Sequence, residues 1–172
     1  MTTLTDHIPV VETERLILRA PRLADFDAYD AFYSDVRSIF VGGPRDRFEN
    51  WFTFLALPGH WALMGFGYWM VELRATGQVI GSVGIIQHLG WPEPELGWQL
   101  FEGFEGHGYA TEATIAARKW AAAQGMAPLV SFVPIPNDRS AALAQRVGCQ
   151  RQGDWESPFG ILNVWRHPQE PA

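Results

Sequence analysis

The stretch EGFEGHGYATEA, residues 102–113, places three glycines within six positions and then continues into a run of helix-forming residues. Glycine reaches positive φ at little cost, so such a loop can point successive amide N–H groups at one place. The start of a helix adds partial positive charge there. Because the residues before the loop, 94–101, alternate like a strand, the stretch predicts a strand–loop–helix junction that binds phosphate.

Three kinds of phosphate loop compete for this stretch. A nucleoside-triphosphate loop needs Lys and then Ser or Thr after its last glycine, but Gly108 is followed by Tyr109 and Ala110. A dinucleotide fingerprint needs a third small residue and an acid about twenty residues on. Thr111 occupies the third position and residues 129–133 carry no acid, which leaves an acyl-CoA diphosphate loop as the best fit.

The segments around the loop alternate between strand and helix signals. Residues 15–21 alternate Leu with charged neighbours and end at Pro21, whereas residues 23–35 place aromatic side chains at helical spacing. We expect a helix at 46–57 to end before Pro58. The remaining predicted strands are 68–74, 78–86, 94–101, 129–135, 149–155 and 161–167, and the remaining helices are 111–125 and 138–148.

This order predicts an α/β (α+β) fold with a single mixed, mostly antiparallel sheet of six to seven strands, flanked by about four helices. At 172 residues and 47% hydrophobic, the chain suits one domain spanning 1–172, with its core at about 12–168.

A net charge of −6 opposes nucleic-acid binding. With no apolar run near 20 residues we expect no membrane association and a cytoplasmic location. Cys149 is the only cysteine, so a cluster of thiolate metal ligands is excluded. We expect its side chain to lie in the core.

Several motifs together resemble one family, the GNAT superfamily of N-acetyltransferases. GFEGHGYATEA is similar to its acyl-CoA diphosphate loop, and the GYATEA continuation resembles the branch of ribosomal-protein N-terminal acetyltransferases. ETERLILRAP, IGSVGI, PELGWQL and NDRSAALAQRVGC resemble further segments of that branch in the same order. The resemblance covers residues 12–168 and implies a GNAT fold that holds acetyl-CoA in a cleft between the fourth and fifth predicted strands.

The resemblance also implies which residues contact the cofactor. Gly103 departs from the family's usual Gln or Arg, His107 stands where Lys or Arg is common, and Glu105 adds negative charge beside the expected diphosphate. Arg139 is a candidate for a nucleotide phosphate or an ordinary surface arginine. The implied cofactor-binding set is Leu100, Phe101, Gly103, Glu105, Gly106, His107, Gly108, Tyr109, Ala110, Thr111, Asn137, Arg139 and Ser140.

Acetyl transfer to an amine needs a base for the ammonium proton and a donor for the leaving thiolate. Glu95 matches an acidic residue of the branch, and it is the first candidate base; a solvated strand end is the alternative. His88 is the second candidate, since imidazole titrates near neutrality. Ser140, matched to the family's Asn-x-x-Ser, is a candidate donor to the sulfur or a capping serine, and Asn137 caps the same helix or binds the cofactor arm. The family's usual tyrosine acid is replaced by Ala144.

The resemblance thus predicts an acetyl-CoA-dependent N-acetyltransferase that modifies a primary amine, either a protein N-terminus or a small molecule, by direct transfer. Trp51, Trp61 and Trp69 fall on the acceptor side in this family and are candidates to line its pocket. A catalytically inactive acyl-CoA binding or sensing protein is the alternative, and an NAD-binding module is a distant third. No metal is expected, and a monomer and a homodimer are both compatible with the sequence.

Overall fold

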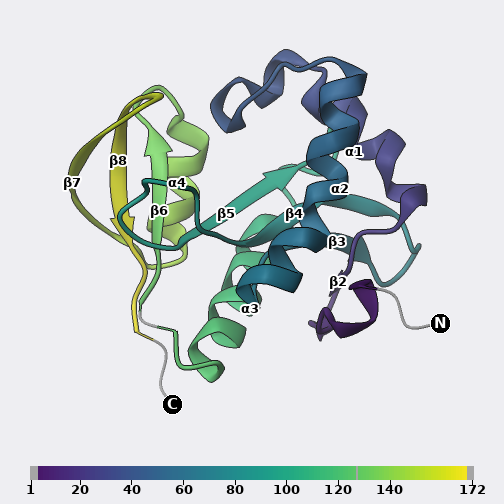
Figure 1. Cartoon of the computed structure of the whole chain (residues 1–172). Coiled ribbons are helices and arrows are strands. Elements are labelled where there is room, and N and C mark those ends of the chain that lie inside the picture. The colour runs from purple at the N-terminus through teal and green to yellow at the C-terminus, as the bar shows by residue number, and fades with distance from the viewer. Residues whose placement is uncertain (1–3, 127, 170–172) are drawn as a thin grey trace.

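The computed structural model describes residues 4–126 and 128–169, which form one open mixed sheet with helices on both faces (Figure 1). The strand order is β1-β2-β3-β4-β5-β6-β8-β7, and every neighbouring pair is antiparallel except β5 and β6. The strands are β1 (Val11–Glu12), β2 (Leu16–Arg19), β3 (Tyr68–Leu73), β4 (Val79–Ile86), β5 (Glu95–Leu100), β6 (Val130–Pro134), β7 (Gln150–Ser157) and β8 (Gly160–Arg166).

Four α-helices lie within the described residues: α1 (Phe26–Tyr33), α2 (Arg47–Met64), α3 (Tyr109–Ala123) and α4 (Asp138–Arg146). Short 3₁₀ helices are η1 (Leu4–His7), η2 (Leu23–Asp25) and η3 (Val36–Val41). The mixed fold and the order of elements agree with the sequence prediction. The sheet has eight strands rather than six or seven because the two-residue β1 adds an edge. None of the described helices is both long and apolar enough to cross a membrane.

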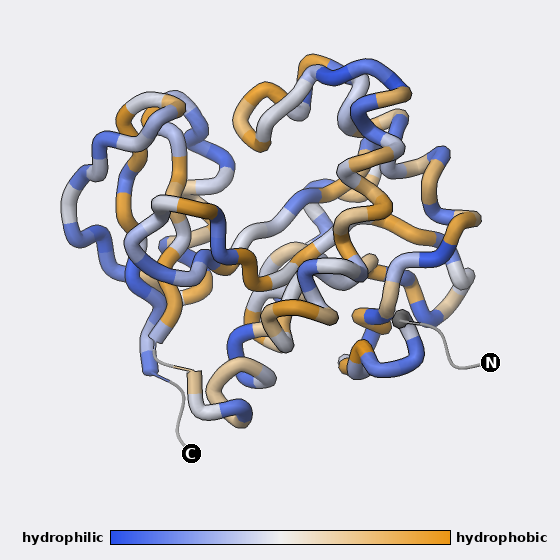
Figure 2. Tube along the Cα trace, viewed as in Figure 1, coloured by the Kyte–Doolittle hydropathy of each residue, from blue (hydrophilic) through white to orange (hydrophobic). Residues whose placement is uncertain are grey.

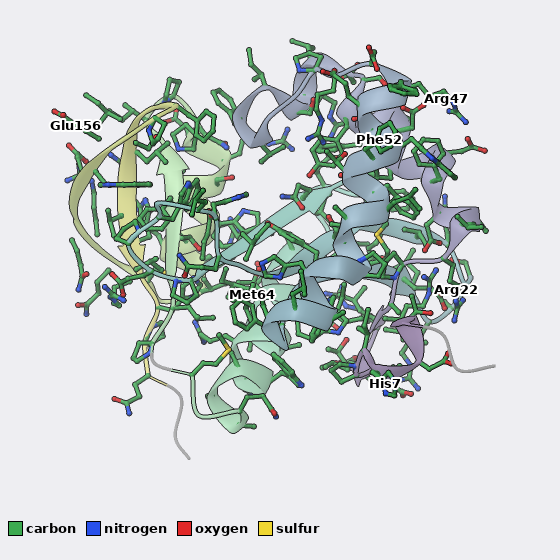
Figure 3. The ribbon with its side chains drawn as sticks, viewed as in Figure 1. His7, Arg22, Arg47, Phe52, Met64 and Glu156 are labelled. Atoms are coloured by element: carbon green, nitrogen blue, oxygen red, sulfur yellow. The ribbon has the colours of Figure 1, made fainter. Side chains whose placement is uncertain are left out.

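Helix α2 corrects the prediction that this helix ends before Pro58. It continues to Met64 and stops at Gly65, which adopts a left-handed φ of 77°. Trp61 explains the extension: its ring is buried, and its Nε1 donates a hydrogen bond of 2.9 Å to the carbonyl oxygen of Tyr68. Phe52 and Met64, labelled in Figure 3, are exposed on the same helix. Tertiary packing of the last turn therefore outweighs the hydrogen bond that proline removes.

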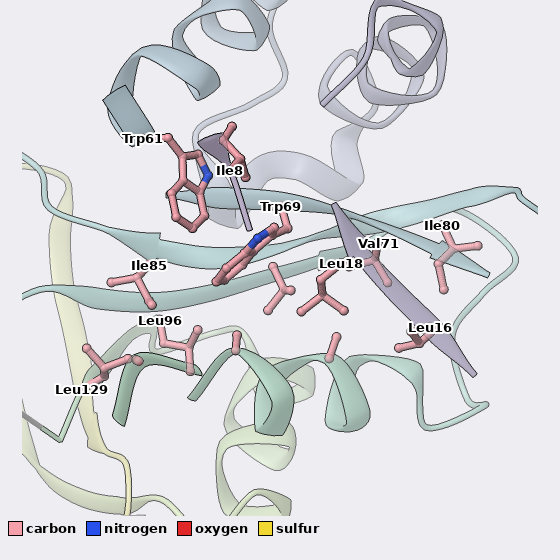
Figure 4. Close-up of a cluster of buried hydrophobic side chains, with 14 residues drawn as sticks. Ile8, Leu16, Leu18, Trp61, Trp69, Val71, Ile80, Ile85, Leu96 and Leu129 are labelled. Atoms are coloured by element: carbon pink, nitrogen blue, oxygen red, sulfur yellow. The ribbon is translucent and has the colours of Figure 1, made fainter. Parts of the chain in front are cut away.

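The largest core cluster fills the space between the sheet and α3 (Figure 4). Helix α3 presents Ala113, Ala117 and Ala121, spaced four residues apart on one buried face. Such small side chains let the helix lie close to the sheet, where it packs on apolar residues of β2–β5 such as Leu16 and Leu96. Figure 2 shows the apolar strands inside and hydrophilic segments at the periphery.

The sheet opens between β5 and β6, since Glu95 and Val130 are the one residue pair in register between them. The apex of this opening is the point at which β5 and β6 are still paired, and a buried chain of hydrogen bonds holds the strands together there. Ser131 Oγ donates to the Leu96 carbonyl at 2.5 Å and accepts from Nε2 of the buried His167 at 2.9 Å. Beyond the apex the two strands separate, and this separation provides the walls of a cleft between the fourth and fifth strands of the sequence prediction.

Candidate active site

A cavity of about 800 Å³ lies between the diverging strands β5 and β6 and the segment formed by α1, η3 and α2. Four predicted site residues line it: His88, Glu95, Asn137 and Ser140. Both candidate bases and the candidate thiolate donor therefore share one space, although they are up to 52 positions apart in the sequence, from 88 to 140.

Glu95 begins β5 at the apex of the split. Its Oε1 accepts a hydrogen bond of 3.3 Å from the backbone N–H of Phe132 on β6. Burial raises the pKa of the Glu95 carboxyl to about 8, against the lowering effect of that hydrogen bond. An ordinary surface carboxylate is fully ionised at neutral pH and is a poor base. Glu95 instead titrates close to the pH range in which a general base is most effective.

His88 lies in the loop before β5, with its ring 4.5 Å from the ring of Trp91. Burial lowers the pKa of His88, and nearby His60 lowers it further. His60 also lines the cavity, and its tautomer follows from its contacts: Nδ1 donates to the carbonyl of Phe66 at 2.6 Å, and Nε2 accepts from the N–H of Gln87. No local pattern in the sequence marks His60, which lies inside the part of α2 predicted to be loop.

Ser140 lies on the first turn of α4, where its hydroxyl faces the cavity. The Trp98 indole N–H donates to Ser140 Oγ at 3.3 Å, so the hydroxyl hydrogen itself remains available to a ligand. Asn137, rather than Ser140, is the helix N-cap: its Oδ1 accepts from the Ser140 N–H at 3.2 Å. Of the two alternatives for Ser140, the capping role is thereby ruled out.

Tyr68 is a further residue of the site, beyond those predicted from the sequence. It lies in one cross-strand row with Gly84 and Gly97, and a Cβ at Gly97 would stand 2.0 Å from the Tyr68 hydroxyl. The glycines therefore leave a channel on the sheet, along which the Tyr68 side chain reaches β5. There its hydroxyl accepts a weak hydrogen bond of 3.4 Å from Gln99. The signal in the sequence was two glycines inside strands, which indicates a close approach of another group.

The glycine-rich loop lies at the far end of β5 and opens directly into α3. Gly103, Gly106 and Gly108 all have φ between 80° and 87°, and Gly108 is the N-cap of α3. Nothing lies within 4 Å of a Cβ placed at Gly103 or Gly106, so the loop fits a diphosphate approaching its backbone. Arg15, 92 positions earlier in the sequence, supports the loop: its Nη1 donates to the carbonyl of His107 at 2.9 Å.

The other residues predicted to bind the cofactor lie around this loop. Phe101 packs its ring 5.6 Å from Phe32 in the core, and Leu100 packs against the α3 cluster, so neither side chain faces the cavity. Tyr109 stacks under the Arg15 guanidinium, 4.8 Å from its ring centroid. Ala110 and Thr111 continue the first turn of α3. The loop thus follows one end of β5, and the residues of β5 from Glu95 to Gln99 line the cavity.

Glu105 is held by positive charge instead of standing alone beside the loop. It forms an ion pair with Arg37 of η3 and a longer one of 3.7 Å with Arg139 of α4. Its Oε2 also accepts from the Gly103 N–H at 3.1 Å. Arg139 is 77% exposed, which keeps its guanidinium accessible to a phosphate. The carboxylate therefore competes with an anionic ligand for two arginines and one loop amide.

The tryptophan expectation is wrong for all three residues named. Trp61 and Trp69 are buried in the core against Trp120, and Trp51 packs on Phe26 outside the cavity. The aromatic wall comes instead from Tyr29, Tyr33, Tyr68, Trp91 and Phe132. Cys149 is buried in an apolar cluster, as predicted, and burial raises its pKa to about 11.

A family model described as "Acetyltransferase (GNAT) domain" matches residues 15–150, most of the chain. The chain belongs to the GNAT acetyltransferase family. It is an acyltransferase, and the resemblance inferred from the sequence is confirmed. The acetyltransferase from Agrobacterium tumefaciens str. C58 is similar, at 43% identity, with 94% of this chain and 95% of that chain covered and a TM-score of 0.87.

Ribosomal-protein acetyltransferases share the fold at lower identity. The Salmonella typhimurium acetyl transferase, which modifies the N-terminal serine of L7/L12, matches at 14% identity, covering 92% of this chain and 98% of its own, with a TM-score of 0.78. A ribosomal L7/L12 alpha-N-protein acetyltransferase in complex with coenzyme A matches at 15% identity, covering 92% and 97%, with a TM-score of 0.77. At these identities the likeness concerns the fold.

Proposed function

We propose that the protein transfers an acetyl group from acetyl-CoA directly to a primary amine. The observation that supports this most is that Glu95, with its raised pKa, and Ser140 share one cavity, and that Glu95 begins the strand β5, whose other end leads into a diphosphate-compatible loop. The coenzyme A complex of a relative with the same fold supports the choice of cofactor.

Acetyl-CoA supplies the activated thioester, and the chain's own residues position the groups around it. The backbone N–H groups of Gly106 and Gly108 and the start of α3 bind the diphosphate. Glu95 takes a proton from the acceptor ammonium, directly or through one water, so that the free amine can attack. Ser140 keeps its hydroxyl hydrogen for the sulfur because Trp98 donates to its oxygen. Tyr68, whose pKa is raised by burial, stays protonated beside them.

The test is a thiol-release assay with acetyl-CoA across a panel of amines and peptides, run from pH 6 to pH 9.5. If Glu95 is the base, kcat/KM rises with pH and levels off above about 8, because only the carboxylate accepts a proton. The Glu95→Gln variant keeps the shape and loses the base, so we expect kcat to fall by about 10²- to 10⁴-fold. Acetyl-CoA affinity, measured by calorimetry, should stay unchanged.

The His88→Gln variant is the matched comparison, since His88 lines the same cavity. Because its pKa lies below 6.5, a His88 base is already deprotonated at neutral pH and predicts a flat profile above pH 7. A Glu95→Gln enzyme with full turnover and the wild-type profile excludes Glu95 as the base. Binding of acetyl-CoA without thiol release for any amine refutes the transferase proposal and leaves an acyl-CoA binding protein.

A further inference from the structure

The acceptor side of the cavity carries an unusual balance of charge. Among the described residues that line it, Glu95 is the one carboxylate and Arg45 is the one arginine or lysine. The remaining lining is mostly aromatic and aliphatic. A polycationic acceptor needs several carboxylates to replace its hydration. This cavity offers one, and Glu95 is already engaged with the reacting amine in the function proposed above, on which this inference rests.

Arg45 is held firmly, and its partners are all neutral. Its backbone N–H donates to the Tyr33 carbonyl at 2.8 Å, its Nε donates to Asn50 Oδ1 at 3.1 Å, and its guanidinium lies 4.3 Å from the Tyr33 ring centroid. Asn50 is fully buried and is itself oriented by a hydrogen bond of 2.9 Å to Asp30. The guanidinium is thus fixed in place at the cavity wall by residues that do not neutralise it.

Nothing in the described chain neutralises Arg45. It forms no ion pair there, whereas its neighbours Arg37 and Arg47 both do. Its Nη2 makes one long contact of 3.5 Å with the Tyr29 hydroxyl, and its Nη1 has no hydrogen-bond partner among the described residues. A half-buried cation with unused donors is costly unless a ligand supplies the negative charge. Its planar fork suits a carboxylate in particular.

The two charged groups belong to opposite walls. Arg45 precedes α2 on the helical wall, and Glu95 begins β5 in the sheet. Tyrosine rings lie between them: Tyr29 contacts Arg45, and Tyr68 extends over Gly97, two residues after Glu95. Tyr68 accepts from Gln99, so its own hydroxyl hydrogen is a second donor for an anionic group. An acceptor in this space meets a base at one wall and an anion site at the other.

We propose that the acceptor is an amino carboxylate with an apolar or aromatic framework, whose carboxylate is bound by Arg45 while its amine lies at Glu95. The aromatic wall binds the framework. Arg45 then determines specificity for the acceptor, and a primary amide of the same compound is a poor substrate because it leaves the guanidinium without a counter-charge.

The test compares matched acceptors and matched variants. γ-Aminobutyrate, 6-aminohexanoate and 4-(aminomethyl)benzoate, in which a chain or a ring separates the amine from the carboxylate, are each assayed beside the corresponding primary amide, with wild-type enzyme and with Arg45→Gln. We expect wild-type kcat/KM to be about 10- to 100-fold higher for at least one carboxylate than for its amide, and Arg45→Gln to remove that advantage while changing the amide's value by less than about threefold. Arg74→Gln, which alters an exposed arginine paired with Glu12 away from the cavity, should behave as wild type.

The results of these assays distinguish failure of the inference from failure of the proposed function. If amines are acetylated with no preference for the carboxylate, or if Arg45→Gln loses carboxylate and amide equally while remaining folded by circular dichroism, the inference is wrong and the proposed function stands. If Arg45→Gln does not fold, Arg45→Lys keeps the charge without the fork and should retain only part of the preference. If no amine releases thiol, the proposed function fails, and calorimetry with phenylpropanoate still decides the anion site: binding that Arg45→Gln abolishes supports it, and absence of binding refutes it.

Discussion

Ser140 is a single residue whose role depends on a neighbour. Because the Trp98 N–H occupies the hydroxyl oxygen, the hydroxyl hydrogen is left for the sulfur, where negative charge grows during transfer. We expect Ser140→Ala to lower kcat by about 10²- to 10³-fold, the range known for removal of a single donor to a developing charge. Its Kd for acetyl-CoA, measured by calorimetry, should change little. Equal losses in turnover and in cofactor affinity indicate a binding role instead.

Glu105 places a carboxylate beside the diphosphate loop, where it competes with the phosphates of the cofactor. It occupies Arg37, Arg139 and the Gly103 amide, all of which suit a phosphate. We therefore expect Glu105→Gln to tighten acetyl-CoA binding by about three- to tenfold, with a larger gain at low salt. Glu102→Gln is the control, since Glu102 is exposed and lies in the same loop. Weaker binding by the Glu105 variant means that the ion pairs order the loop.

At the scale of single elements, the helix α2 separates what local sequence predicts from what packing decides. Pro58 and Gly59 are reliable stop signals in isolation, but Trp61 and the Gly65 cap lie beyond them and carry the helix to Met64. The strands and the other helices were predicted close to their observed bounds, because their hydrophobic period and turn residues act locally. The two-residue β1 was missed since it is defined only by its pairing with β2.

The same helix yields a stability prediction. Gly59 has helical backbone geometry, and nothing lies within 4 Å of a Cβ placed there. Alanine removes the entropic cost of glycine in a helix, so Gly59→Ala should raise the free energy of unfolding by about 0.5 to 1 kcal/mol, measured by urea denaturation. Gly67→Ala is the matched opposite, because its Cβ would lie 2.6 Å from the Trp61 ring. A destabilised Gly59→Ala means that α2 is strained at Pro58.

At the scale of the whole molecule, the site is assembled from segments that no local pattern connects. Glu95 and Ser140 were identified because each belongs to a motif with its own strand or helix signal. Arg45, His60 and Tyr68 reach the cavity only because the fold brings the segment before α2, the helix α2 and the strand β3 to one space, so no local feature distinguishes them from surface or core residues. For the same reason Trp61 and Trp69 were misplaced: their position in the sequence was right, but their side chains face the core.

The apex of the sheet should also set how the whole fold responds to acid. His167 is buried beside Ser131, and burial lowers its pKa from 6.5 to about 3. The unfolded chain therefore binds one more proton than the native chain between these values, so the stability that neutral His167 contributes is present above pH 6.5 and is lost as the pH falls toward 3. This amounts to about 1.4 kcal/mol per pH unit. Glu95 has the opposite sign, since its raised pKa costs stability as the pH rises from 4.5 to about 8.

Replacing His167 by Gln keeps a donor for Ser131 and removes the titration. The free energy of unfolding of wild type and of His167→Gln is measured by urea denaturation at each pH. Below pH 6.5 we expect the variant to gain on wild type by about 1.4 kcal/mol for each unit that the pH falls. Above pH 6.5 the difference between the two proteins should be constant. Parallel curves across this range mean that His167 is solvated as the sheet opens.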